Sequence, residues 1–266
     1  PTEIEISESG TCNRKCSFCP RSAPDFEDKK EFISHELIIK VAKELSNLDY
    51  KGVIRFSGFV EPLLDKNIYE HIKNFRDYLP NSRIEVVTNG DPLNKNRLEK
   101  LFKHGLDKIL ISAYDGEEDV EKFKKIVLEC ELDEDQYIIR DRSLPEEEDF
   151  GITLSNRAGM MEKAEFKITK LHQPLDNPCY IPSYTLFFDY LGDVLMCPHD
   201  WGKKIILGNL KKENLVDIWF KEKSMKIRKK LSNNDRKFSP CNVCDVNGTL
   251  MGAENSKYFK GKKFLF

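Results

Sequence analysis

Three cysteines near the start of the chain, Cys12, Cys16 and Cys19, have the spacing Cys-x3-Cys-x2-Cys. Three thiolates on one short segment can bind three irons of a [4Fe-4S] cube and leave the fourth iron open to another chelator. The alternatives are a zinc knuckle that lacks one ligand and a chance cluster, but structural zinc sites usually have four protein ligands. The spacing therefore favours an iron-sulfur cluster with one open iron.

A second set of four cysteines lies towards the C-terminus. Cys179 and Cys197 flank Gly192 as Cys-x12-Gly-x4-Cys, and Cys241 and Cys244 form a Cys-x2-Cys pair. Four thiolates would saturate a second [4Fe-4S] cluster, but the same set would also suit a tetrahedral zinc ion. Cysteines so close in sequence have poor geometry for bonding to one another, and a reducing compartment keeps them unpaired. We therefore interpret both sets as metal ligands.

Composition restricts the partners of the 266-residue chain, of which 39% is hydrophobic and 33% is charged. The 43 Lys and Arg residues nearly balance the 45 Asp and Glu residues, so no global field attracts a nucleic acid or an anionic membrane. The N-terminal stretch has no charged segment followed by an apolar core, as a secretory or transit peptide would have. We expect a cytoplasmic protein without a membrane span or a nucleic-acid partner.

Alternating apolar runs and amphipathic segments in the first part of the chain predict an α/β fold with a parallel sheet. Apolar residues recur at helical spacing between the runs, for example at Leu37, Val41 and Leu45. Ser34 and Asn67 are expected to cap two of these helices. The predicted strands are residues 3–7, 52–57, 83–88, 108–112 and 136–140.

A second region begins after about residue 165. Residues 184–190 and 193–196 have the pattern of a β-hairpin, and residues 214–231 have the pattern of a helix. We therefore expect two domains, residues 1–165 and residues 166–266.

The first cysteine motif, CNRKCSFC with Phe18 at its aromatic position, resembles the signature of radical S-adenosylmethionine (SAM) enzymes. The resemblance implies a partial (β/α)6 TIM-like barrel in which SAM chelates the open iron. An electron from the cluster then cleaves SAM to a 5'-deoxyadenosyl radical, which abstracts hydrogen from the substrate. An electron donor such as flavodoxin or ferredoxin would be required.

The same resemblance assigns residues to SAM at the ends of the predicted strands. Residues 57–62, SGFVEP, resemble the motif that receives the SAM amino group, although Phe59 and Val60 loosen the match. A carboxylate at Glu61 can accept a charge-assisted hydrogen bond from that group. An ordinary solvated role is the alternative for Glu61, and surface ion pairs are the alternative for the arginines. The expected SAM-binding residues are Phe18, Gly58, Glu61, Thr88, Asn89, Ser112, Arg140 and Arg142.

The second cysteine set resembles the auxiliary-cluster region of the SPASM/twitch branch of this family. Position 250 is Leu, and no cysteine follows Cys244, which indicates the shortened twitch form with one auxiliary cluster. The resemblance favours a second [4Fe-4S] cluster over zinc, and a cluster with four protein ligands suits electron transfer. The cofactors implied are SAM and two [4Fe-4S] clusters, on a partial barrel followed by a small twitch domain formed by a β-hairpin and a helix.

These parts predict an oxidoreductase. Loss of hydrogen and then of a proton from a hydroxyl-bearing carbon leaves a reducing radical that can pass its electron to the auxiliary cluster. We therefore expect oxidation of a small polar hydroxylated substrate such as a sugar, cyclitol or nucleotide-sugar, as in dehydrogenases of the twitch branch. A radical SAM epimerase or peptide-modifying maturase is the alternative, and a zinc-binding interaction module is a more remote one.

Three further residues are candidates for the reaction itself. His199 and Asp200 follow a ligand cysteine, and either could accept the hydroxyl proton or orient the cluster. Arg157, in the segment NRAG, is a candidate substrate contact or a structural ion pair.

Overall fold

Alternating buried residues build the parallel strands of the protein. Strands β4 (Val53–Phe56), β5 (Arg83–Thr88), β6 (Lys108–Ala113) and β7 (Tyr137–Asp141) pair in this order and run parallel. One face of these strands is apolar and fully buried, as at Ile54, Val86 and Ile111. The prediction of a parallel α/β sheet is confirmed.

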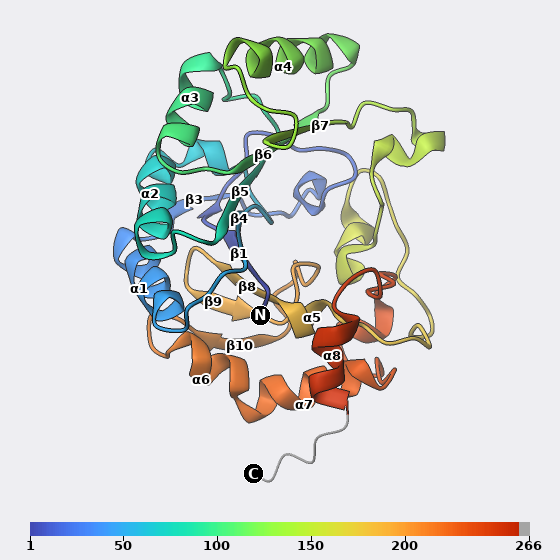
Figure 1. Ribbon diagram of the computed structural model, residues 1–266. Helices are drawn as coiled ribbons and strands as arrows, with labels where there is room; N and C mark the ends of the chain where they lie inside the picture. Colours follow the sequence, from blue (N-terminus) through green and yellow to red (C-terminus); the bar gives the residue numbers. More distant parts are fainter. Residues whose placement is uncertain (261–266) are drawn as a thin grey trace. The chain divides into compact units, whose positions relative to one another are not determined.

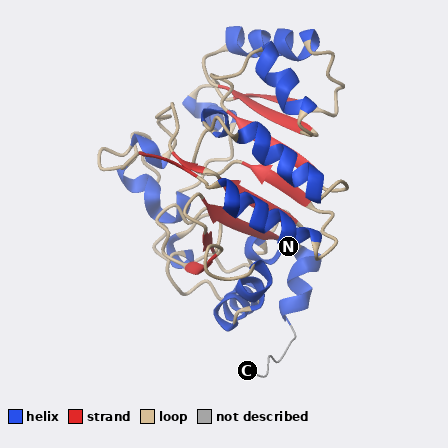
Figure 2. Ribbon diagram, turned by 90° about the vertical axis from the view of Figure 1, so that its left-hand side faces the viewer, coloured by secondary structure: helices blue, strands red, loops and turns tan. Residues whose placement is uncertain are grey.

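Four amphipathic helices cover that apolar face (Figures 1 and 2). They are α1 (His35–Ser46), α2 (Ile68–Tyr78), α3 (Lys95–Lys103) and α4 (Glu117–Glu129). Ser34 caps α1, because its side chain accepts a hydrogen bond from Leu37 N. Asn67 occupies the N-cap position of α2 as predicted, but its side chain makes no capping hydrogen bond, and its backbone N donates to Asp65 Oδ1 at 2.8 Å.

The computed structural model describes residues 1–260, which form two compact units. We call Ile6–Asn13 with Lys30–Leu154 the barrel unit, and Pro1–Glu5, Arg14–Lys29 and residues 155–260 the C-terminal unit. Each unit is described by itself. The expected domain boundary at residue 165 stays a prediction.

The first strand, β1 (Glu3–Ser7), reaches the barrel unit at its last residues, where Ser57 N donates to Ile6 O at 3.0 Å. Two short strands, β2 (Ser9–Gly10) and β3 (Lys29–Phe32), form a second small sheet. Within residues 1–260 no sheet closes on itself, so the expected partial barrel is confirmed. No helix in this part of the chain combines the length and the apolar character that a membrane span requires.

The C-terminal unit contains the expected hairpin, of β8 (Thr185–Asp189) and β9 (Asp193–Leu195), and a third strand, β10 (Ile206–Asn209), antiparallel to β9. The predicted single helix over residues 214–231 is wrong in one respect. Lys221 has an extended backbone and divides it into α6 (Leu215–Phe220) and α7 (Glu222–Ser232). The remaining helices are α5 (Ile181–Tyr184) and α8 (Ala253–Lys260), with short 3-10 segments η1 (Pro20–Ser22), η2 (Pro62–Leu64), η3 (Glu146–Gly151), η4 (Arg157–Lys163) and η5 (Cys241–Val243).

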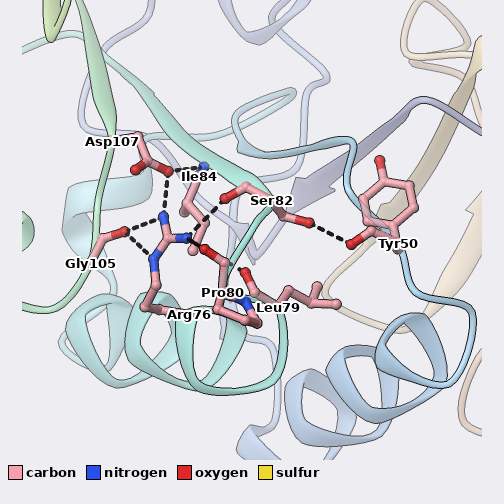
Figure 3. Close-up of polar contacts among 8 residues, drawn as sticks. All are labelled: Tyr50, Arg76, Leu79, Pro80, Ser82, Ile84, Gly105 and Asp107. Carbon is pink, nitrogen blue, oxygen red and sulfur yellow. Dashed lines mark hydrogen bonds and ion pairs between the residues drawn. The ribbon is translucent and has the colours of Figure 1, made fainter.

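Arg76 of α2 ties together the segments that lead into β5 and β6 (Figure 3). Its guanidinium donates to Pro80 O at 2.8 Å, to Ser82 O at 3.0 Å and to Gly105 O at 2.9 Å. It also pairs with Asp107, whose Oδ2 accepts from Ile84 N at 2.7 Å. One side chain thus fixes the starts of two strands whose opposite ends carry the predicted SAM-binding residues.

We expect Arg76→Met to lower the free energy of unfolding by about 2 kcal/mol, because the carbonyls and Asp107 lose a charged donor. Urea denaturation followed by circular dichroism measures this change. The control is Arg83→Met, which removes an exposed arginine paired with Glu85 and should cost at most about 0.5 kcal/mol. Equal losses in the two variants would contradict a special role for Arg76.

Candidate functional site

Glu61 is a buried connection between the loop after β4 and the end of β5. Its Oε1 accepts from Leu63 N at 2.9 Å and from Thr88 Oγ1 at 2.6 Å, and its Oε2 accepts from Asn89 N at 2.7 Å. The residue is 1% exposed. Burial raises the pKa of Glu61 to about 7, although the three hydrogen bonds favour the charged form. Through its hydrogen bonds with Thr88 Oγ1 and Asn89 N, Glu61 fixes the position of the end of β5.

The segment around Cys12 is linked to this carboxylate through the end of β5. Asn89 Nδ2 donates to Asn13 Oδ1 at 2.8 Å and lies 3.8 Å from Cys12 Sγ. Asn13 Nδ2 donates in turn to Asp91 Oδ2 at 2.5 Å. Three residues of the barrel unit that were predicted from separate motifs, Cys12, Glu61 and Asn89, are thus brought together.

Backbone hydrogen bonds join the same two loops. Glu61 N donates to Thr11 O at 3.3 Å, and Phe59 N donates to Ser7 Oγ at 3.2 Å. Gly58 has a φ of +94°, which a residue with a side chain rarely adopts. The glycine therefore permits the turn that carries Glu61 to the end of β5.

Ser112 and Arg140 lie opposite each other on β6 and β7. Burial of the half-buried Arg140, and then the charge of Arg55, lower the pKa of the Arg140 guanidinium. Arg142 donates to Gly151 O, so the structure brings its side chain to the chain segment that follows β7. Ser112 and Arg140 are neighbours, whereas Arg142 stabilises a loop.

The other two cysteines of the first motif belong to the C-terminal unit. Cys19 N donates to Cys16 O at 2.9 Å, and Ser22 Oγ donates to Cys19 O at 2.8 Å. These bonds form a tight turn over residues 16–19, in which Phe18 is half-buried. Burial raises the pKa of the Cys19 thiol, which the nearby charge of Arg21 partly offsets.

The four cysteines of the second set converge. Cys179, Cys197, Cys241 and Cys244 line one pocket in the C-terminal unit. Burial raises the pKa of each thiol, and for Cys197 the other three cysteines act in the same direction.

The donor set of this pocket fits an iron-sulfur cluster. A [4Fe-4S] cube takes one thiolate per iron, so its four ligands surround it and need not share one ion. Within residues 1–260, no three His, Cys, Asp or Glu side chains are arranged to hold a single metal ion. Gly248 (φ +75°) lies so close to Cys179 that a Cβ atom at position 248 would overlap the Cys179 Sγ atom. Only glycine at this position therefore leaves room for the cysteine side chain.

His199 lines this pocket, and Arg157 lies beside it. Arg157 NH1 is 3.3 Å from His199 Nδ1, and Ser155 Oγ is 3.5 Å from the same nitrogen. Burial, and then the Arg157 charge, lower the pKa of His199 to about 3. The imidazole is therefore neutral at neutral pH and stands beside a fixed cation.

Asp200 is buried and engaged with the backbone. Its Oδ1 accepts from Lys204 N and its Oδ2 accepts from Ile205 N, at 2.9 and 2.8 Å. These contacts make Asp200 a structural support of the turn after Cys197, and its predicted role as a proton acceptor stays a prediction.

Sequence reasoning missed the residues that hold the NRAG segment. Asn156 N donates to both carboxylate oxygens of Asp245 at 2.9 Å, and Asn156 Nδ2 donates to Val243 O at 2.7 Å. The segment that carries Arg157 is thereby bound to the Cys241–Cys244 loop. The position of Asp245 directly after a ligand cysteine is the signal that could have suggested this role.

Comparisons with known proteins agree with these features. The family model of the radical SAM superfamily matches residues 6–129, and the model of the SPASM iron-sulfur cluster-binding domain matches residues 179–245. The S-adenosyl-L-methionine-dependent 2-deoxy-scyllo-inosamine dehydrogenase of Niallia circulans is 30% identical over 244 residues, which cover 91% of this chain and 92% of the relative.

Solved structures extend the likeness to the whole fold. A crystal structure of BtrN in complex with AdoMet and 2-DOIA has a TM-score of 0.77 at 29% identity and covers 92% of this chain and 93% of the other. A structure of BtrN in an open conformation has a TM-score of 0.69 at 26% identity, with 92% of each chain covered. The chain belongs to the radical SAM superfamily, as a radical SAM oxidoreductase that carries a SPASM domain and uses SAM and iron-sulfur clusters.

Proposed function

We propose that the protein is a dehydrogenase that oxidises a secondary hydroxyl group of a small polyhydroxylated molecule, of the cyclitol or sugar class, to a ketone. The pocket at which Cys179, Cys197, Cys241 and Cys244 meet carries this proposal. A cluster bound by four thiolates leaves no iron open to a substrate, so its suitable role is to take up an electron. Alcohol oxidation releases such an electron after a hydrogen atom and a proton have left. The relative named for dehydrogenation of 2-deoxy-scyllo-inosamine supports the cyclitol class.

We propose that each cysteine set holds one [4Fe-4S] cluster. Cys12, Cys16 and Cys19 would bind the first, on the strength of their spacing, and the four cysteines of the pocket would bind the second. When bound, these clusters together with SAM supply the 5'-deoxyadenosyl radical and accept the electron that remains on the substrate. We further propose flavodoxin or ferredoxin as the electron donor, and the cytoplasm as the compartment, because it keeps thiols reduced.

The polar end of the barrel unit would bind SAM. The Oε2 atom of Glu61 accepts one hydrogen bond, from Asn89 N, and a carboxylate oxygen can accept a second from the SAM amino group. Ser112 and Arg140, side by side on β6 and β7, would contact the rest of the methionine portion. Gly58, Thr88 and Asn89 would hold the surrounding loops, Phe18 would contact the cofactor from the cysteine motif, and Arg142 would support the loop after β7.

Arg157 and His199 would contact the substrate. A guanidinium can donate two hydrogen bonds to neighbouring hydroxyl groups, and its charge favours loss of a proton from a bound hydroxyl. With its pKa lowered to about 3, His199 would be a weak proton acceptor, so its neutral imidazole would instead orient a substrate hydroxyl by hydrogen bonding. Asp200 would keep the turn after Cys197 in place.

The reaction class is tested with anaerobically reconstituted protein, SAM and a panel of cyclitols and sugars. We expect about eight irons per chain, formation of 5'-deoxyadenosine and a product lighter by two hydrogens. Mass spectrometry of the product distinguishes the alternatives. A product of unchanged mass that carries one hydrogen from solvent would indicate epimerisation and contradict dehydrogenation.

The role of Glu61 is tested by the pH dependence of SAM binding to the cluster-loaded enzyme. With a pKa of about 7, the carboxylate is charged above that pH and protonated below it. The wild-type protein should bind SAM about tenfold more tightly than Glu61→Gln at about pH 8, and this advantage should vanish by about pH 6. Anaerobic calorimetry measures both affinities.

The control for this experiment is Asp107→Asn, which alters a carboxylate that accepts a backbone N–H from Ile84 at the opposite end of the strands. Its SAM affinity should follow that of the wild type at every pH. A wild-type advantage over Glu61→Gln that is the same at both pH values would exclude a titrating contact between Glu61 and SAM.

The role of Arg157 is tested by Arg157→Met. Loss of a charged donor to the substrate should lower kcat/KM by about tenfold to a hundredfold, chiefly through KM. Iron content and substrate-independent SAM cleavage should stay unchanged. Lys163→Met, an exposed change in the same 3-10 segment, is the control. Unaltered kinetics in Arg157→Met would remove this residue from the substrate site.

A further inference from the structure

Arg236 is a buried cation that donates only to backbone carbonyls. Its Nε donates to Asn177 O at 2.9 Å, and its two terminal nitrogens donate to Pro178 O and to Val246 O, both at 2.7 Å. A further bond reaches Asn247 O. The side chain is 2% exposed. One guanidinium therefore joins the segment at residues 177–178 to the segment at residues 246–247.

These two segments carry cysteines of the second set. Residues 177–178 lead directly into Cys179, and residues 246–247 follow Cys244 closely. Arg236 also lines the pocket at which the cysteines converge. A side chain that binds both segments fixes the separation of two thiols that are far apart in the sequence.

Among residues 1–260, the hydrogen-bond partners of the Arg236 guanidinium are backbone carbonyls and include no carboxylate. An uncompensated buried charge destabilises a protein unless an anion lies near it. Arg236 lines the same pocket as Cys179, Cys241 and Cys244, so its charge acts on an anion bound there. A [4Fe-4S] cluster with four thiolates is anionic and gains one further negative charge when it is reduced.

We propose that Arg236 is a positioning residue of the auxiliary cluster, which clamps the ligand segments around Cys179 and Cys244 and whose buried charge raises the reduction potential of the cluster. The inference rests on the proposed role of the four cysteines as cluster ligands. A cation beside the cluster favours the reduced state, and this makes the cluster a better acceptor for the electron of the oxidised substrate.

The geometry requires arginine in particular. The carbonyls lie on both sides of one planar group, and a guanidinium presents five N–H donors in a fixed fork. A lysine would retain the charge, but its ammonium has three donors on a flexible stem and cannot span the same carbonyls. The two functions of Arg236 can therefore be separated by substitution: Arg236→Lys keeps the charge and loses the clamp, and Arg236→Gln loses the charge.

The C-terminal unit offers a matched control in Arg228. It is equally buried, at 2% exposure, and it also donates to backbone carbonyls, to Pro182 O at 2.7 Å and to Trp219 O. Its guanidinium lies over the ring of Trp219 at 3.6 Å. It is not among the residues that line the cysteine pocket. Arg228→Gln thus removes a buried cation of similar surroundings that does not border the cluster.

The experiment measures the auxiliary cluster alone, in a background in which Cys12, Cys16 and Cys19 are all replaced by Ala. Each variant is reconstituted anaerobically, its iron is counted, and its midpoint potential is determined by redox titration followed by electron paramagnetic resonance. The background protein should hold about four irons. If it holds none, the proposed function fails, whereas the inference about Arg236 is judged on the potentials of proteins that do hold the cluster.

Arg236→Gln should make reduction of the cluster at least about tenfold less favourable, a midpoint potential lower by about 59 mV for a one-electron couple. Arg236→Lys should keep a potential near that of the background but lose iron faster to a chelator. Arg228→Gln should change neither quantity. Loss of iron from both Arg236 variants but not from Arg228→Gln would support the clamp. An unchanged potential in iron-loaded Arg236→Gln, or equal changes in Arg228→Gln, would overturn the proposal.

Discussion

The buried carboxylate of Glu61 is the interaction on which the reactive end of the barrel unit depends. Three separate segments meet through it, because it accepts from Leu63 N, Thr88 Oγ1 and Asn89 N and because Asn89 continues to Cys12. Burial of an acid is unfavourable unless donors surround it, and here the donors are parts of the site itself. The hydrogen bonds that stabilise the buried carboxylate therefore also fix the positions of the residues that donate them.

In the C-terminal unit a buried positive charge, rather than a negative one, is surrounded by hydrogen-bonding groups of the site. Arg236 buries a positive charge against backbone carbonyls, next to four thiols whose pKa values burial raises. Thiols and a lone cation make a poor apo core, because the thiols must lose protons before they can bind iron and the cation lacks an anion. An anionic cluster would bind the thiolates and also neutralise the charge of Arg236. The pocket is thus better explained as a binding site for such a cluster than as part of the protein core.

The sequence predicted the features that depend on neighbouring residues and missed those that depend on segments far apart in the chain coming together. The bounds of strands β1, β5 and β6 were predicted to within one residue, because a strand's apolar pattern is set by the types of adjacent residues. Cysteine spacing likewise selected the residues that line the pocket. Arg236 could not be found in this way, because its partners lie on two distant segments and nothing near it marks a site. The sequence pattern also did not indicate that the Asp200 carboxylate accepts hydrogen bonds from the N–H groups of the turn that follows it.

The charges of the C-terminal unit favour one direction of reaction. Arg157 places a cation beside the neutral His199, and a cation next to a hydroxyl favours loss of its proton once hydrogen has been abstracted. A deprotonated radical is a stronger reductant, because the remaining negative charge assists departure of the electron. Arg236 places a second cation at the cysteine pocket, where it favours arrival of that electron. In the proposed reaction, the charge of Arg157 stabilises the negative charge that loss of the proton leaves on the substrate. The charge of Arg236 stabilises the negative charge that the electron then brings to the cluster. An epimerase would need the reverse, a radical that keeps its electron until it receives a hydrogen atom, and a cation at the acceptor pocket would work against it.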